Sequence, residues 1–226
     1  LLHRAYYGLR DWPELIKLLP ELRKYKVLSP EALVELEREV YIGQLTTSVG
    51  KGDDTGGDQL RQAWQKMPVN LKQDPALLLN YVAMLVSSGQ NSTAEKVILK
   101  ALKNRWDSAL VRQYGLISSE QPAKQLAQAE SWLPSQTEDA QLLLALGRLC
   151  ARDKLWGKAR DYFESSYRLE RTPEICAELG RLIQALGEPK VAAAYYREGL
   201  QMGESGLPEL PMPESTVPAA RRLARS

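Results

Sequence analysis

An internal repeat with a period of 33 residues constrains the fold of this chain more than any other feature of its sequence. Segment 139–171 and segment 172–203 carry the same kinds of residue at matching positions. A repeat period of about 20 to 50 residues is typical of solenoid proteins, in which copies of one small unit stack. The matched pairs are Leu143 and Cys176, Leu146 and Leu179, Gly147 and Gly180, Cys150 and Ile183, Ala159 and Ala192, Phe163 and Tyr196, and Ser166 and Gly199.

Within each copy, bulky and small residues alternate in a way that predicts two antiparallel helices. Small residues allow the helices to approach closely, and the bulky residues fill the spaces opposite them. The pattern resembles the tetratricopeptide repeat, although Leu143 and Cys176 replace its first aromatic residue. The resemblance implies an all-α fold of tetratricopeptide-like helical hairpins, about 12 helices in six pairs, stacked into a right-handed superhelix.

The repeat array is expected to cover residues 1–202, with degenerate first, second and fourth units. Ser29 and Asp74, each followed by proline, are predicted to cap the first helices of the second and third units. The fourth unit, 107–133, keeps Gly115 and Ala127 at the required spacing of 12, but two serines at 118–119 shorten its first helix. Segment 203–226 is rich in proline and is expected to be a disordered tail.

Composition and motifs argue against several functional classes. The 30 basic and 28 acidic residues nearly balance, which disfavours nucleic-acid binding. The single histidine, His3, and the absence of phosphate-loop, nucleophile and metal-binding motifs predict a protein that is not an enzyme and holds no metal or cofactor. Cys150 and Cys176 occupy core positions of helices and are expected to be apolar filler.

The concave face formed by the first helices is the predicted partner-binding groove. Arg148 and Arg181 occupy the same position in consecutive units, and arginines repeated along a groove suit carboxylate recognition. The alternative is a solvated helix face on which these arginines pair with Glu174 or Glu178. The predicted groove residues are Arg112, Gln141, Leu144, Arg148, Arg152, Glu174, Ala177, Arg181 and Gln184.

Several short strings, taken in order, resemble the repeat region of the bacterial HemY-type family, which is associated with protohaem biogenesis. They are AY at 5–6, WPELIKLLP at 12–20, YIG at 41–43, LG at 146–147 and WGKA at 156–159, with the interrupted unit 107–133 in between. The resemblance implies a longer parent chain with two N-terminal membrane helices. It places the repeats, as a soluble part of that chain, at the cytoplasmic face of the inner membrane.

Three functional hypotheses follow from these features. The leading one is a non-catalytic scaffold whose groove holds a protein or peptide partner, including haem-biosynthesis enzymes as the family resemblance implies. The second is a haem or porphyrin carrier that binds propionate groups through Arg148 or Arg181. The third, a membrane-associated enzyme, has no sequence motif in its favour; in particular, no dinucleotide-binding glycine motif follows a strand.

Overall fold

The computed structural model describes residues 2–49 and 56–203, and within them all regular secondary structure is helical. Twelve α-helices in this part of the chain form six consecutive pairs, which confirms the predicted all-α fold of helical hairpins. Two short 3-10 helices, Leu71–Gln73 and Leu133–Ser135, precede α5 and α9. The α-helices are α1 (Leu2–Leu9), α2 (Trp12–Lys24), α3 (Pro30–Val49), α4 (Gly56–Lys66), α5 (Pro75–Ser87), α6 (Asn91–Asn104), α7 (Ser108–Tyr114), α8 (Pro122–Glu130), α9 (Ala140–Arg152), α10 (Trp156–Leu169), α11 (Pro173–Ala185) and α12 (Pro189–Gly203).

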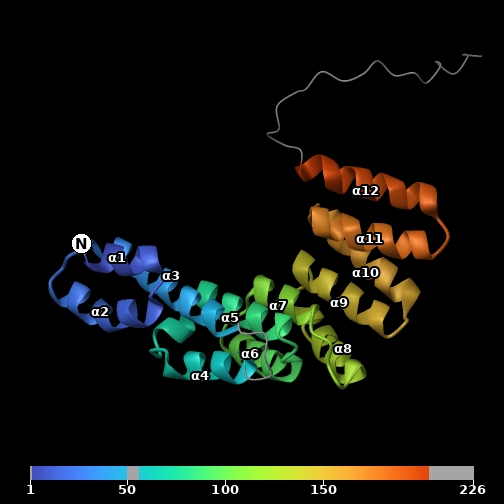
Figure 1. Ribbon diagram of the computed structural model, residues 1–226. Helices are drawn as coiled ribbons and strands as arrows, with labels where there is room; N and C mark the ends of the chain where they lie inside the picture. Colours follow the sequence, from blue (N-terminus) through green and yellow to red (C-terminus); the bar gives the residue numbers. More distant parts are fainter. Residues whose placement is uncertain (1, 50–55, 204–226) are drawn as a thin grey trace, which may run out of the picture.

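The six pairs form an array that bends in its second half (Figure 1). Helices α1 to α6 make one arm and α9 to α12 make the other, and the short helices α7 and α8 lie where the two arms meet. The predicted tail, 203–226, lies outside the described residues except for Gly203, the last residue of α12. No helix of the described ranges is long and apolar enough to cross a membrane.

Side-chain caps explain where the first helices begin. Asp74, Asp139 and Thr172 each accept a hydrogen bond from a backbone N–H in the first turn of the helix that follows. Ser29 does the same for the amide of Ala32, as the sequence predicts. Each cap satisfies an amide that has no partner inside its helix, so these positions mark the start of the second, third, fifth and sixth units.

The small positions of the repeat bring the two helices together in the fifth and sixth pairs. A Cβ atom added to Gly147 would lie 2.3 Å from a ring carbon of Phe163, and one added to Gly180 would lie 2.5 Å from the ring of Tyr196. At the last small position, the Ser166 hydroxyl is fully buried and donates to the carbonyl oxygen of Ala140 at 2.8 Å. The repeat positions therefore encode close helix contacts, as the alternation of bulky and small residues predicts.

Helix α9 is the central element of the core. Ten of its 13 residues are buried, because α7 and α8 pack on it from one side and α10 from the other. A helix that is apolar nearly all round needs neighbours on every side. Helix α9 therefore connects the fourth unit to the fifth.

Candidate functional site

The bend begins with a first helix that ends early. Helix α7 stops at Tyr114, and Gly115 lies so close to α9 that an added Cβ would be 2.6 Å from the Cα of Ala145. The interruption predicted for this unit is therefore present, and it lets the backbone after α7 pass directly over α9.

Two side chains hydrogen-bond to the carbonyl oxygens left free where α7 ends. Arg152 of α9 donates to the carbonyl oxygens of Gly115 at 2.6 Å and Ile117 at 2.7 Å. The buried Gln125 of α8 donates to the carbonyl oxygens of Tyr114 at 3.1 Å and Ile117 at 3.2 Å. Carbonyl oxygens at a helix end have no partner inside the helix, so these donors stabilise the interruption.

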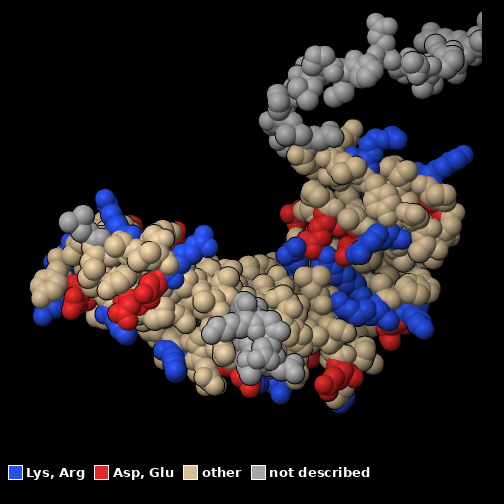
Figure 2. Space-filling view, viewed as in Figure 1, with Lys and Arg blue, Asp and Glu red and all other residues tan. Residues whose placement is uncertain are grey.

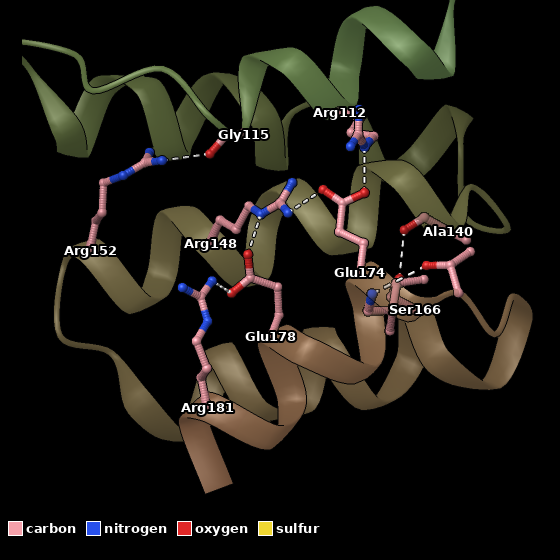
Figure 3. Close-up of polar contacts among 11 residues, drawn as sticks. Arg112, Gly115, Ala140, Arg148, Arg152, Ser166, Glu174, Glu178 and Arg181 are labelled. Carbon is pink, nitrogen blue, oxygen red and sulfur yellow. Dashed lines mark hydrogen bonds and ion pairs between the residues drawn. The ribbon is translucent and has the colours of Figure 1, made fainter. Parts of the chain in front are cut away.

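An ion-pair network crosses three successive first helices, α7, α9 and α11 (Figure 3). Glu174 of α11 accepts from Nε of Arg112 on α7 at 2.5 Å and also from Nη2 of Arg148 on α9. Nε of Arg148 donates to Glu178 at 2.9 Å, and Glu178 also pairs with Arg181 one turn further along α11. The network thus ties the fourth, fifth and sixth units together.

The two arginines at the same repeat position have different environments. The Arg148 side chain is 7% exposed, whereas that of Arg181 is 67% exposed. Arg148 is covered because α11 supplies two glutamates above it, while Arg181 has no following first helix within the described residues. Arg148 is therefore a structural part of the bend, and Arg181 is accessible to a partner.

Glu174 carries a perturbed pKa that connects the network to stability. Burial alone would raise the pKa of this carboxyl, but hydrogen bonds from Arg112 and Arg148 outweigh burial and hold the pKa below its ordinary value. A carboxyl whose pKa is lower in the folded protein than in the unfolded chain stabilises the fold. This contribution is fully present at pH values above the unfolded-state pKa, which is about 4.3 for glutamate. This contribution is lost as the pH falls through the folded-state pKa.

We expect Glu174→Gln to lower the free energy of unfolding by about 1 to 2 kcal/mol near neutral pH, because a charged acceptor of two arginines is lost. The difference from the unmodified protein should shrink as the pH falls from 6 towards about 3, where Glu174 itself becomes protonated. Urea unfolding at a series of pH values measures this difference. Glu138→Gln, at an exposed position without an ion pair in the described structure, is the control. A loss at Glu174 that is independent of pH would contradict the assigned network.

A cavity of about 500 Å³ adjoins the network. Its walls are the exposed Leu116 after α7, the start of α10 at Trp156, and one face each of α9 and α11. Three of the predicted groove residues, Arg148, Arg152 and Arg181, line this cavity. The remaining lining residues are Ala151, Phe163, Glu178, Leu182 and Ala185.

Other predicted groove residues lie apart from the cavity. Leu144 is fully buried in the core, so it is not available to a partner. Gln141 donates to Glu170 at 2.9 Å near the start of α9. Ala177 and Gln184 lie on α11, where Gln184 is exposed. The structure therefore brings together the arginines and Glu174 but not the whole predicted set.

The sequence alone did not indicate the roles of Leu116 and Trp156 in this cavity. Trp156 is 46% exposed, although a tryptophan near the start of a helix is more often a packing residue. Leu116 follows the shortened helix, and its position depends on how that segment crosses α9. The only available signal was the interruption itself, because an irregular segment between helices is a common place for binding residues.

Comparison with known proteins finds no matching family model, but it finds curated relatives. The chain is 24% identical over 203 residues to Protein HemY of Escherichia coli K12, and equally to Protein HemY of Shigella flexneri. The match covers 89% of this chain and 50% of each relative, so the chain spans about half the length of the curated relatives it matches. This confirms the resemblance to HemY-type proteins that the sequence motifs indicate.

Among solved structures, the chain is similar to MamA 41-end from Desulfovibrio magneticus RS-1, with 18% identity and a TM-score of 0.48. That match covers 76% of this chain and 97% of the MamA chain. A MamA RS-1 double mutant is similar at 17% identity and a TM-score of 0.47.

Proposed function

We propose that this chain is a non-catalytic scaffold that holds a protein partner against the concave side of its bend. The observation that carries the proposal is the arginine-lined cavity between α9 and α11, where exposed cationic and aromatic side chains lie together. Arginine and tryptophan are enriched among residues that dominate binding at protein interfaces. Stacked helical pairs provide a long, preformed surface of this kind.

The non-catalytic part of the proposal rests on the distribution of reactive groups. His3 lies in α1, at the far end of the array from the cavity (Figure 1). Both cysteines are buried, and burial raises the pKa of the Cys150 thiol to about 11, which keeps it protonated at neutral pH. Within residues 2–49 and 56–203, no three His, Cys, Asp or Glu side chains are grouped to hold a metal ion.

The cellular setting comes from the family resemblance. HemY-type proteins are associated with protohaem biogenesis, so the proposed partner is a protein of haem or porphyrin biosynthesis. We place the repeats at the cytoplasmic face of the bacterial inner membrane, attached through membrane helices of a longer parent chain. Both statements are proposals about the whole protein, because this chain spans about half the length of the curated relatives it matches.

The carrier hypothesis has less support than the scaffold. Arg152 and Arg181 have the charge that propionate groups need, but the cavity is lined by no His, Cys, Tyr or Met that could ligate haem iron. A saturable shift of the haem absorption band at micromolar protein would revive the carrier hypothesis.

Affinity capture from bacterial membrane extract, with this chain as bait, tests the scaffold. We expect Arg181→Glu to reduce recovery of the partner at least about fivefold, because it reverses an exposed charge at the binding surface. Arg148 is unsuitable for this test because it is buried and paired. Arg168→Glu, the same change at an exposed position on α10, is the control. Equal recovery with both variants and the unmodified bait would overturn the proposed surface.

A further inference from the structure

The cavity at the bend has an excess of positive charge. Arg148, Arg152 and Arg181 line it, whereas Glu178 is the one carboxylate among its lining residues. Arg152 forms no ion pair with a carboxylate of the described chain and uses two of its nitrogens for backbone carbonyl oxygens. Lys and Arg side chains also gather at this place in Figure 2, where the two arms meet. The site therefore has more cationic groups than its own glutamates neutralise.

One nitrogen of Arg148 has no partner. Nε and Nη2 pair with Glu178 and Glu174, but Nη1 is buried and makes no hydrogen bond to any part of the chain that the structure describes. A buried donor without an acceptor is unusual in folded proteins. Partial desolvation and then the charge of Arg148 lower the pKa of Arg152, so the two guanidinium groups repel each other. An anion beside Arg152 would offset this repulsion.

Part of the cavity wall is apolar. Trp156 and Leu116 are both exposed there, and the small side chains of Ala151 and Ala185 line the same cavity. An exposed tryptophan beside an exposed leucine favours a ligand that brings an apolar side chain as well as a charge. A free inorganic anion would use the arginines but would leave this wall uncovered.

We propose that the cavity binds a carboxylate of an acidic peptide segment, with a neighbouring apolar side chain of that segment packed against Trp156 and Leu116. The inference rests on the proposed function and states the chemistry of the partner. Arg152 and Arg181 contact the carboxylate, and Arg148 provides positive charge from behind them. Charge complementarity selects an acidic segment, and the absence of an iron ligand in the lining favours a peptide over haem.

A short labelled peptide with two glutamates beside leucine and phenylalanine, titrated into the chain and followed by fluorescence anisotropy, tests the inference. We expect saturable binding that weakens at least about tenfold when both glutamates become glutamine, and again in high salt. Arg181→Gln and Trp156→Ala should each weaken binding about fivefold or more, while Arg168→Gln should leave it unchanged. Thermal melting followed by circular dichroism verifies that each variant is folded.

Several results would overturn the inference. These are equal binding of the glutamate and glutamine peptides, or binding insensitive to both Arg181→Gln and Trp156→Ala. Protoporphyrin that binds while the acidic peptide does not would assign the carboxylates to a tetrapyrrole instead. If partner capture from extract depends on Arg181 but the peptide does not bind, the scaffold is retained and only the carboxylate assignment fails.

Discussion

Arg148→Ala is expected to lower the free energy of unfolding by about 3 kcal/mol, whereas Arg181→Ala should change it by less than about 0.5 kcal/mol. The two arginines occupy the same position in consecutive repeats, so local sequence does not explain the difference. Arg148 is buried beneath α11 and pairs with Glu174 and Glu178. Removing it leaves two largely buried carboxylates with fewer cationic partners and also opens space beside α9.

At Arg181 the same change removes an exposed arginine that pairs with Glu178 three residues away on the same helix, and Glu178 keeps its bond to Arg148. Exposed pairs of this kind contribute little, because water and salt screen them. Urea unfolding followed by far-ultraviolet circular dichroism measures both variants under one set of conditions. Arg148→Lys keeps the charge but loses the planar double donor, so its loss of unfolding free energy should lie between those of Arg148→Ala and Arg181→Ala. Losses of equal size at both positions would contradict the structural role given to Arg148.

Gly147→Ala should destabilise the protein by about 1 to 3 kcal/mol through overpacking. The added Cβ would come within 2.4 Å of two ring carbons of Phe163. Phe163 is 2% exposed and packs within the core cluster, so a shift of its ring would break its existing contacts. Differential scanning calorimetry or urea unfolding measures the loss.

Gly157→Ala is the matched control, because an added Cβ there has no neighbour within 4 Å. The free energy of unfolding of this variant should be unchanged or higher by less than about 1 kcal/mol, since alanine favours helix more than glycine does. Combining Gly147→Ala with Phe163→Leu should recover part of the loss, because the smaller side chain makes room for the methyl group. A Gly147→Ala protein as stable as the unmodified chain would show that α9 and α10 are not packed as closely as described.

The repeat positions made much of the fold predictable. The spacing of Gly147, Phe163 and Ser166 and of their counterparts encodes contacts within one helical pair, and such contacts repeat wherever the pattern repeats. Helix caps are also local, so Ser29 and Asp74 could be recognised from the residues beside them. The two serines after α7 are a local signal as well, and they indicate the interrupted unit.

The candidate site was less predictable, because it depends on contacts between units. The repeat pattern treats Arg148 and Arg181 as equivalent, yet only Arg148 has a following first helix to cover it. Leu144 occupies a predicted groove position but is fully buried, because α9 packs against α7, α8 and α10. The cavity itself needs Leu116, whose position follows from the irregular segment after α7.

Site-specific photo-crosslinking tests the central claim of partner binding at the bend most directly. A photoreactive benzoylphenylalanine replaces the exposed Ala185 in the cavity wall or, as a control, the exposed Asp161 on α10. Each protein is irradiated in bacterial membrane extract. The account predicts a discrete crosslinked product from position 185 that disappears with Arg181→Glu, and no such product from position 161. A product from position 161 with none from position 185 would contradict binding at the arginine-lined cavity.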